Sequence, residues 1–414
     1  MKVQPSRVSL RGLLAIAALS LMLAQAAWSA PRYRILHYFS GTDGEGPWGG
    51  VTLGRKGQLY GTGASGGTGG GCNGYGCGTV YELRPHADGK WTDSVLYDFG
   101  SRNDGAAPYG KVMLDASGHI YGTTNGGGAN RDSGTVFELG YDASGWKEAV
   151  LYSFCAKPDC SDGAFPDAGV VMDTSGNLYG TAGVVFQLSR GSDGWKETVL
   201  YTFCAKHPKC GDGAAPFAGV ILDASGNLYG TTYGGGAYNG GTAYEIERTA
   251  NGWREKVLHS FAVNHKDGHT PGWGSLFMDG SGNLYGTTAG GGCCGGVIFK
   301  LTSGSDGEWK ETILYEFKGG TSGFEPNAGV VMDKSGNLYG TTDYGGGSCD
   351  CGVIYKLTPG PKGKWTYTVL HEFGVGNDGG VPEGNLVMDS KGNLYGGTVL
   401  GGTYGGGIIF ELTP

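Results

Sequence analysis

The sequence predicts an all-β fold, a seven-bladed β-propeller made of four-stranded antiparallel blades. The first observation is a recurring segment, Asp-x-Ser-Gly-Asn-Leu-Tyr-Gly-Thr, whose clean, near and degenerate copies start at Asp173, Asp223, Asp279, Asp333, Asp115, Asp389 and Gly54. Its period of roughly 50–58 residues is typical of propeller blades rather than of helical solenoids. The second observation is that the 86 glycines fall at fixed offsets between aromatic and β-branched runs, where they indicate turns.

One repeat, residues 107–154, shows the expected order of strands. Residues 111–114 form a short apolar strand, and a tight turn leads to a second strand over 119–124. A Gly-rich loop precedes a third strand over 134–139, and a polar turn precedes a fourth over 146–154. Charged residues on the fourth strand suit an outermost position, because charge at a sheet edge discourages aggregation. The unit therefore predicts one four-stranded blade.

The two ends of the mature chain predict how the ring closes. Residues 33–39 match a fourth strand alone, and residues 408–412 match a third strand. The last blade thus lacks its outermost strand, and the N-terminal segment can supply one. We expect residues 31–414 to form a single propeller domain in which the N-terminal strand completes the last blade.

The first thirty residues have the pattern of an export signal. Lys2, Arg7 and Arg11 precede an apolar run over 13–23, and small residues offer cleavage sites near 26–30. The run is short for a membrane span. Without the three cations of the signal segment, the net charge of −8 becomes −11 on the mature chain. A strongly acidic protein is disfavoured as a partner of nucleic acid. We expect a secreted or periplasmic monomer with no membrane span.

The ten cysteines form five local pairs, which in an exported chain predict disulfides that stiffen loops. The pairs are Cys72/Cys77, Cys155/Cys160, Cys204/Cys210, Cys293/Cys294 and Cys349/Cys351. A metal site is disfavoured because the pairs lie in different repeats and lack a Cys-x-x-Cys frame. No metal and no cofactor are predicted.

Residues found in every repeat are expected to build the blade. The Asp-x-Ser-Gly-Asn segments suit hairpin turns better than calcium loops, which need more oxygen ligands. The Trp of the fourth strand should be a packing residue in each unit: Trp91, Trp146, Trp195, Trp253, Trp309 and Trp365. The Tyr of the second strand should be another.

The repeat resembles a known family. The pattern Asn-Leu-Tyr-Gly-Thr-Thr-x-Gly-Gly-Gly, followed by Gly-x-x-Phe/Tyr-x-Leu, a Trp and Val-Leu-Tyr-x-Phe, resembles the GloVer tandem repeat of exported bacterial proteins. It also looks like the kelch blade. The resemblance covers residues 33–414 and implies a propeller, but it implies no particular reaction.

The binding residues are expected where the repeats differ. The loops between strands two and three, and between consecutive blades, share one face of the disc. A turn of the form Asp-Gly-x-x-Pro lies there, and the residue after each Pro should ring the channel mouth. Aromatic, acidic and amide groups at this ring could bind neutral sugars. With one neighbouring Trp, the predicted ligand-binding residues are Trp48, Tyr109, Asp167, Phe217, Trp273, Asn327 and Glu383.

Two patterns give weak catalytic candidates. His265, Asp267 and His269 place two imidazoles around an acid, which suits a general base or a metal ligand. A glycosidase needs a carboxyl pair at a defined separation, for which Glu45, Asp167, Glu325 and Glu383 are the candidates. In the third unit the second loop is missing, which should leave a notch beside Tyr233 and Tyr238.

The first functional hypothesis is a non-catalytic secreted propeller whose loop-bearing face binds a glycan or another exported protein. The alternatives are a polysaccharide lyase or glycoside hydrolase on the same scaffold, and a structural protein of the envelope or matrix. No phosphate-loop or His-Glu-x-x-His motif occurs. The fold alone does not choose among these hypotheses.

Overall fold

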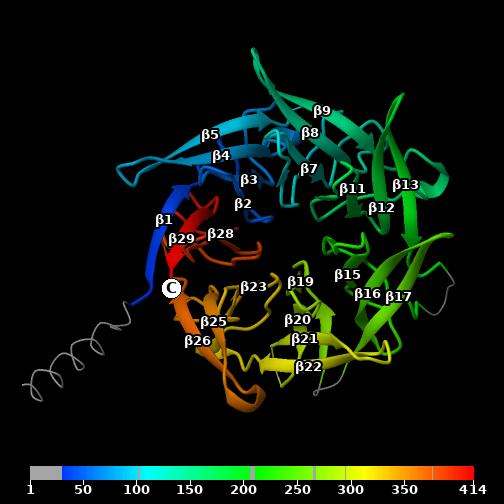
Figure 1. Cartoon of the computed structure of the whole chain (residues 1–414). Coiled ribbons are helices and arrows are strands. Elements are labelled where there is room, and N and C mark those ends of the chain that lie inside the picture. Colours follow the sequence, from blue (N-terminus) through cyan, green and yellow to red (C-terminus); the bar gives the residue numbers. More distant parts are fainter. Residues whose placement is uncertain (1–29, 101–102, 206–209, 264–266, 294, 375) are drawn as a thin grey trace, which may run out of the picture.

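Seven antiparallel sheets stand around a common centre in the computed structural model (Figure 1). It describes residues 30–100, 103–205, 210–263, 267–293, 295–374 and 376–414, so the predicted signal segment lies almost entirely outside the described residues. Six sheets have four strands and one has five. The predicted seven-bladed propeller is therefore confirmed.

Blades 1 to 4 follow one another in the sequence, and each runs from its innermost to its outermost strand. Blade 1 contains β2 (Val51–Leu53), β3 (Leu59–Gly63), β4 (Thr79–Pro85) and β5 (Trp91–Asp98). Blade 2 contains β6 (Met113–Leu114), β7 (Ile120–Thr124), β8 (Thr135–Asp142) and β9 (Gly145–Ser153). Blade 3 contains β10 (Val171–Met172), β11 (Leu178–Thr181), β12 (Val184–Gly191) and β13 (Gly194–Thr202). Blade 4 contains β14 (Ile221–Leu222), β15 (Leu228–Thr232), β16 (Asn239–Thr249) and β17 (Gly252–Ala262).

Blades 5 to 7 repeat the order with one addition. Blade 5 contains β18 (Gly268–Pro271), β19 (Phe277–Met278), β20 (Leu284–Gly291), β21 (Val297–Ser303) and β22 (Trp309–Glu316). Blade 6 contains β23 (Val331–Met332), β24 (Leu338–Thr342), β25 (Val353–Pro359) and β26 (Trp365–Glu372). Blade 7 contains β27 (Val387–Met388), β28 (Leu394–Thr398), β29 (Ile408–Thr413) and β1 (Arg32–Tyr38). Short 3-10 turns occupy Cys72–Gly74, Pro158–Cys160, Gly320–Ser322 and Pro361–Gly363.

The innermost strands are shorter than the sequence predicts. In blade 2 the ladder covers Met113–Leu114 only, whereas four residues were expected from Lys111 onward. The reason is the crowding of neighbouring blades at the centre. There the inner segments bond one another instead, as where the Gly274 N–H donates to the Asn327 carbonyl oxygen (2.7 Å).

The ring closes as predicted, through the first and last strands. Strand β1 pairs antiparallel with β29, from Arg32 opposite Thr413 to Tyr38 opposite Ile408. In Figure 1 these strands lie side by side, in blue and red. The ring of Tyr33 also stacks on His371 of blade 6, with centroids 3.7 Å apart. The N-terminal strand therefore joins the last blade and contacts the blade before it.

The Tyr-Gly-Thr motif has a steric cause. In blade 3, Gly180 of β11 lies opposite Phe186 of β12, and the Phe ring lies over the glycine. A Cβ added at Gly180 would lie 2.7 Å from Cζ of Phe186. Each blade places a Phe or Tyr of its third strand over this glycine, so a side chain there would displace the largest core residue of the blade.

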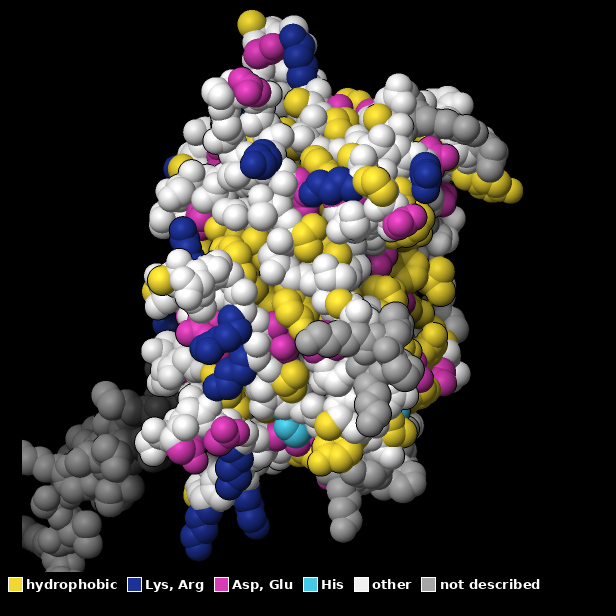
Figure 2. All heavy atoms as spheres, turned by 90° about the vertical axis from the view of Figure 1, so that its right-hand side faces the viewer, with side chains coloured by type: hydrophobic (Ala, Val, Ile, Leu, Met, Phe, Trp, Pro, Cys, Tyr) yellow, Lys and Arg dark blue, Asp and Glu magenta, His cyan; other side chains and the backbone are white. Residues whose placement is uncertain are grey.

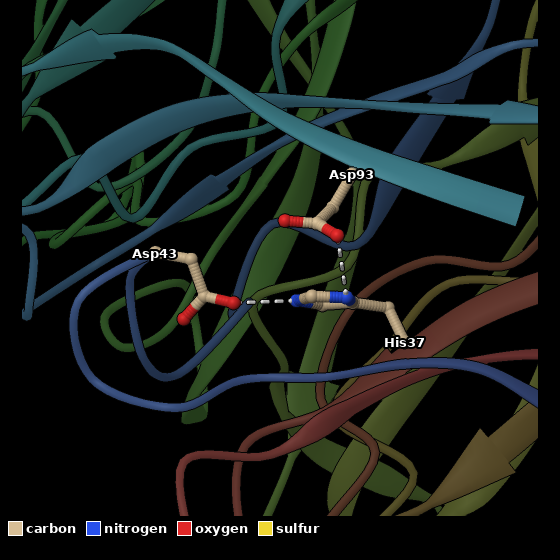
Figure 3. Close-up of side chains that lie close together, drawn as sticks. All are labelled: His37, Asp43 and Asp93. Atoms are coloured by element: carbon tan, nitrogen blue, oxygen red, sulfur yellow. Dashed lines mark hydrogen bonds and ion pairs between the residues drawn. The ribbon is translucent and has the colours of Figure 1, made fainter.

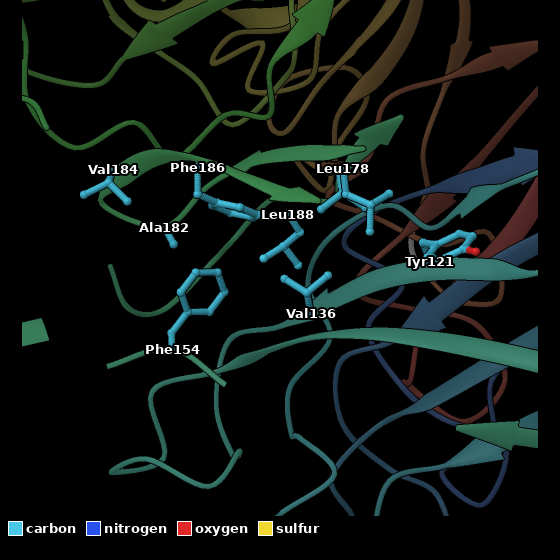
Figure 4. Close-up of a cluster of buried hydrophobic side chains, with 9 residues drawn as sticks. Tyr121, Val136, Phe154, Leu178, Ala182, Val184, Phe186 and Leu188 are labelled. Atoms are coloured by element: carbon cyan, nitrogen blue, oxygen red, sulfur yellow. The ribbon is translucent and has the colours of Figure 1, made fainter. Parts of the chain in front are cut away.

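The hydrophobic core lies between blades rather than within them. Between blades 2 and 3, Val136 and Phe154 meet Leu178 and Phe186, all of which are fully buried (Figure 4). The rings of Phe154 and Phe186 pack edge to face with centroids 5.1 Å apart. Burying a Phe side chain stabilises a fold by about 1.5–3 kcal/mol. The predicted Trp packing residues are confirmed, because each packs against one of the seven interblade clusters.

The Asp-x-Ser-Gly-Asn segments form hairpin turns, as predicted. In blade 3 the backbone N–H groups of Ser175 and Asn177 donate to Oδ1 of Asp173. The Asn177 amide and the Tyr179 hydroxyl donate to Oδ2 (2.8 and 2.9 Å). Gly176 has φ of 82°, which glycine adopts without strain. The turn thus uses both oxygens of its own carboxylate.

Each outermost strand contains a β-bulge at the same point. In blade 3, Val185 pairs with Tyr201 and Phe186 with Val199, so Leu200 is the extra residue. The extra residue is a leucine in every blade: Leu36, Leu96, Leu151, Leu200, Leu258, Leu314 and Leu370. A bulge interrupts the alternation of side chains. The leucine and the Tyr or His after it can therefore both pack toward the next blade.

That Tyr or His belongs to what we call the outer junction. An outer junction comprises this residue, the Asp of the following Asp-Gly turn and the residue facing them from the next blade's outermost strand. In three junctions a Tyr hydroxyl donates to the Asp: Tyr97 to Asp104, Tyr152 to Asp162 and Tyr201 to Asp212. A His takes the place of the Tyr at residues 37, 259 and 371.

Four of the predicted disulfides are present: Cys72–Cys77, Cys155–Cys160, Cys204–Cys210 and Cys349–Cys351. They indicate an oxidising compartment. The predicted link between Cys293 and Cys294 is not supported, since Cys293 has a free thiol and Cys294 lies outside the described residues. Adjacent Cα atoms are about 3.8 Å apart, closer than the roughly 4.4–6.8 Å usual in disulfides.

The two faces of the disc differ in composition. In the edge-on view of Figure 2, Lys and Arg side chains lie mainly toward the left-hand rim, and hydrophobic side chains gather along the right-hand rim.

Among the described residues there is no helix of the length and apolar character that crossing a membrane requires.

Candidate functional site

A cavity of about 370 Å³ lies at the mouth of the central channel. It is lined by residues that enter the innermost strands of blades 1, 2, 3, 5 and 7: Trp48, Gly49, Tyr109, Gly110, Lys111, Asp167, Ala168, Gly169, Trp273, Ser275, Glu383, Gly384 and Asn385. Five of the seven predicted ligand-binding residues are among them. The structure therefore brings together residues up to 335 positions apart in the chain, as Trp48 and Glu383 are.

Three aromatic side chains, Trp48, Tyr109 and Trp273, line the cavity. Trp48 and Tyr109 meet edge to face with centroids 5.8 Å apart. Trp273 is stacked on Phe217, with centroids 4.6 Å apart and an interplanar angle of 21°. Trp48 and Trp273 are 39% and 43% exposed, so their rings are accessible to a ligand. Phe217 does not line the cavity but supports Trp273 from behind.

Two carboxyl groups of unequal acidity line the same cavity. Burial raises the pKa of Glu383 to about 7. Burial also raises the pKa of Asp167, to about 6, although the hydrogen bond from the Asn125 amide to its Oδ1 (2.8 Å) lowers it. Of the two, Asp167 is the stronger acid and Glu383 the more readily protonated.

Lys111 is the basic group of the cavity, and the sequence analysis missed it as a functional residue. Burial lowers the pKa of its amine to about 8. Within the described part of the chain, its Nζ has no hydrogen-bond or ion-pair partner. The signal was present in the repeat: the corresponding position is Gly50, Gly169, Gly219, Ser275, Gly329 and Asn385 in the other blades. Lys111 is thus the single large basic residue at a position that is otherwise Gly, Ser or Asn. It was overlooked because it was counted as the first residue of an expected strand.

The small residues at this ring let the inner segments approach one another. A Cβ added at Gly169 would lie 1.9 Å from the carbonyl oxygen of Lys111, and one at Gly274 would lie 1.9 Å from the Gly329 nitrogen. Asn385 instead reaches across to blade 6, where its Oδ1 accepts from the Gly329 N–H (2.7 Å). Closely packed backbone of the inner segments therefore forms part of the cavity wall.

A third acidic group, Asp343, lies close to the cavity but is not among the residues that line it. Asp343 is 2% exposed and accepts a hydrogen bond from the Asn327 amide. Burial, followed by the charge of Glu383, raises its pKa well above the usual range. Asn327 thus points to Asp343 and is not among the residues that line the cavity.

The remaining catalytic candidates are not brought to the cavity. Glu45 and Glu325 lie outside its lining, and His265 lies outside the described residues. Asp267 contacts His259 at an outer junction, while His269 belongs to β18 and lies opposite Gly290. The predicted His-x-Asp-x-His loop is thus partly a strand, because β18 extends a contact that other blades make through single bridges.

The short second loop of blade 3 is observed as a tight turn at Ala182 and Gly183, where the Ala182 N–H donates to the Val184 carbonyl oxygen (2.9 Å). The neighbouring Tyr233 and Tyr238 are 43% and 64% exposed. Only Tyr233 approaches the aromatic group of the cavity, with its ring 5.7 Å from that of Phe217.

The repeats and the ring of blades define a tandem-repeat β-propeller. The chain belongs to the Gloeobacter/Verrucomicrobia repeat family, whose model matches residues 24–205, 181–346 and 293–414. The family resemblance stated from the repeat motif is thereby confirmed. Among curated proteins, none matches the chain significantly.

Three solved propellers are similar to the chain at 14% sequence identity. The match to a gluconolactonase from Xanthomonas campestris covers 92% of this chain and 89% of the gluconolactonase, with a TM-score of 0.42. The match to an oxidoreductase from Thermus thermophilus, described as a glucose dehydrogenase, covers 93% of this chain and 100% of the oxidoreductase, with a TM-score of 0.47. The match to a fungal alcohol oxidase in complex with copper covers 93% of this chain and 77% of the oxidase, with a TM-score of 0.55. At this identity the likeness shows the fold alone.

The first functional hypothesis, a non-catalytic binding propeller, is corrected by these comparisons. The three propellers are described as enzymes, and none of them as a binding module. The alternative of an enzyme on this scaffold is therefore taken up as a proposal, because the likeness itself shows the fold alone. Since 14% identity carries no reaction from one propeller to another, the chemistry has to be argued from the cavity.

Proposed function

We propose that the chain is a glycoside hydrolase that cleaves a neutral glycan in the cavity at the channel mouth. One observation carries the proposal: two carboxyl groups with different pKa values, Asp167 and Glu383, line a cavity that also exposes aromatic rings. Environments that separate the pKa values of two acids assign them an acid and a base role.

The roles follow from the protonation states. Glu383, with a pKa of about 7, holds a proton at neutral pH and is the general acid that protonates the glycosidic oxygen. Asp167, with a pKa of about 6, is the carboxylate that activates water or attacks the sugar. The amide of Asn125 orients Asp167 through its hydrogen bond.

The aromatic rings and the charge favour a neutral substrate. Trp48, Tyr109 and Trp273 offer flat surfaces on which sugar rings can stack. A polysaccharide lyase acting on uronic acids would need cations to bind the substrate carboxylates, and Lys111 is the cavity's single basic side chain. The net charge of −8 also repels anionic polymers. These features support a hydrolase over a lyase.

An oxidising compartment, indicated by the disulfides, agrees with the signal pattern of residues 1–30. We therefore include secretion or a periplasmic location in the proposal, with the chain acting as a monomer on an extracellular glycan.

The test is a panel of neutral polysaccharides with reducing-end release as the readout. Glu383→Gln and Asp167→Asn should each lower kcat/KM by roughly 10²–10⁴-fold, the range of general acid–base contributions. Glu325→Gln is the matched control, because it changes a carboxyl outside the cavity and should leave turnover unchanged. No turnover on any neutral glycan, or a product with the absorbance of an unsaturated uronate, would refute the hydrolase.

A further inference from the structure

The outer junction between blades 4 and 5 is one of the three in which a His replaces the Tyr. His259 on β17 replaces the Tyr of the repeat, Asp267 follows in the loop, and Glu311 comes from β22 of the next blade. Nε2 of His259 lies 3.5 Å from Oδ2 of Asp267 and 3.7 Å from Oε2 of Glu311. Both carboxylates therefore approach the same ring nitrogen, at distances longer than an ordinary N–H···O hydrogen bond.

Two atoms of this cluster are buried without a hydrogen-bond partner among the described residues. They are Nε2 of His259 and Oε1 of Glu311. The unpartnered Oε1 recurs at Glu148, Glu197 and Glu255 of other blades, so it is a feature of the repeat, and an unpartnered Nε2 also occurs at His371. What sets His259 apart is that two carboxylates approach its unpartnered Nε2 from just beyond hydrogen-bond distance, and buried polar atoms in native proteins are nearly always bonded. Asp267 is held in place, since it accepts from the Ala262 and Gly268 N–H groups (2.9 and 2.7 Å).

The separations suit a metal ion. The three donor atoms all lie within 4.8 Å of one another. A tetrahedral zinc ion with bonds of about 2.0–2.2 Å holds its ligand atoms about 3.4 Å apart. The two measured separations from His259 are close to this value without any rearrangement. Three protein ligands leave a fourth position for water, and the His259 side chain, 21% exposed, lies near enough to the surface to admit an ion.

The junction between blades 7 and 1 provides an internal comparison (Figure 3). There the acids approach different nitrogens: Nε2 of His37 lies 2.9 Å from Oδ2 of Asp43, and Nδ1 lies 3.9 Å from Oδ1 of Asp93. Figure 3 shows the imidazole lying between the two carboxylates. The donor atoms of this group also lie within 4.8 Å of one another, but Nε2 of His37 is already hydrogen-bonded to Asp43 and is not left without a partner.

We propose that His259, Asp267 and Glu311 form a zinc site that joins blade 4 to blade 5. One imidazole and two carboxylates match the ligands that zinc accepts. Calcium is a poorer fit because it takes six to eight oxygen ligands. The site lies at the outermost strands, away from the channel-mouth cavity, and it does not depend on the proposed hydrolase activity.

The test uses the mature chain carrying Cys293→Ser, so that the free thiol cannot bind the metal. Zinc chloride is titrated by calorimetry after removal of metals with a chelator, and the melting temperature is recorded with and without zinc. One zinc ion per chain should bind and raise the melting temperature, whereas calcium chloride should leave it unchanged.

His259→Tyr is the decisive variant, because it installs the Tyr–Asp pair that Tyr201 and Asp212 already form one junction earlier. It should fold and should bind zinc roughly 100-fold more weakly or not at all, since it loses the nitrogen ligand. Glu311→Gln should weaken zinc binding by roughly tenfold or more. His37→Tyr is the matched control and should bind zinc as tightly as the parent.

The proposal would be overturned by a parent chain that does not bind zinc. It would equally be overturned by a His259→Tyr chain that binds zinc like the parent, or by a loss of binding in His37→Tyr alone.

Discussion

The outer junctions and the channel-mouth cavity are made by the same seven repeats, yet they use the repeats in opposite ways. At the outer junctions the same Tyr–Asp pair recurs in three blades, for example as Tyr97 with Asp104 and Tyr201 with Asp212. At the cavity almost every blade offers a different residue, such as Trp48, Asp167 or Glu383. The comparison teaches that residues shared by the repeats build the fold, and that residues in which the repeats differ are the candidates for binding and catalysis.

The same rule applies inside each region. His259 differs from the Tyr of its repeat, and two carboxylates approach the same nitrogen of its ring. Lys111 differs from the small residues of its ring, and it lines the cavity with a lowered pKa. Changes at the outer junctions should therefore alter stability without altering turnover, and changes to the carboxyl groups of Asp167 and Glu383 in the cavity should do the opposite.

The largest effect should come from removing residues 31–38, which carry β1. The deletion leaves β29 as an open edge and removes the stacking of Tyr33 on His371. We expect the melting temperature to fall by about 10 °C or more, since each kcal/mol shifts the melting point by a few degrees. Calorimetric scanning measures it. A peptide spanning residues 31–40, added in excess, should restore part of the loss, and an unchanged melting point would contradict closure by β1.

The pH dependence of turnover should be next in size. Glu383 must hold its proton, so activity falls as the pH rises through its pKa of about 7. Asp167 must be ionised, so activity falls as the pH drops through its pKa of about 6. A bell-shaped profile of kcat/KM with a maximum at about pH 6.5 is expected. Asp167→Asn should abolish the acidic limb in what activity remains, and a flat profile from pH 5 to 8 would contradict the assignment.

A methyl group at the centre of the ring should have an intermediate effect. Gly169→Ala places a Cβ against the carbonyl oxygen of Lys111, so we expect a loss of about 1–3 kcal/mol in the free energy of unfolding. Gly219 holds the same position in blade 4, but its Cβ would meet Oγ of Ser275 at 3.1 Å. Gly219→Ala should therefore cost less. Denaturant unfolding compares the two, and equal losses would show that the crowding at Lys111 is unimportant.

The smallest effect should appear at an ordinary outer junction. Tyr201→Phe removes the hydrogen bond to Asp212 (2.9 Å) and keeps the packing of the ring. We expect a loss of about 1 kcal/mol in the free energy of unfolding, with turnover unchanged. Denaturant unfolding and the glycan assay measure the two quantities. A loss of turnover with unchanged stability would reverse the roles that we assign to the two regions.

The fold could be predicted from the sequence because seven copies of one pattern report the same local physics. Gly176 fixes a turn, Gly180 makes room for Phe186, and Leu200 bulges the outer strand, and each has a counterpart in the other blades. The bulge itself was not predicted, because the run Val-Leu-Tyr is apolar throughout and gives no sign of which residue is unpaired.

The site could be predicted only in part. The residue after each Pro was identified, which located Trp48, Tyr109, Asp167 and Glu383 at the channel mouth. Lys111 was concealed by its place at the start of an expected strand. The partnership of His259 with Glu311 joins two blades across 52 positions of sequence, and only the packing of neighbouring outer strands brings them together.

The pairing of β1 with β29 has a consequence for how the protein is made. Arg32 meets Thr413, so the first strand of the propeller waits for the last. At synthesis rates of roughly 5–20 residues per second, that wait lasts roughly 20–80 s. Throughout it, β1 is an unpaired strand with exposed backbone groups, which can pair with another growing chain. The contact with the largest sequence separation also demands the costliest loop closure, so the ring should form late and its yield should depend on how well nascent chains are kept apart.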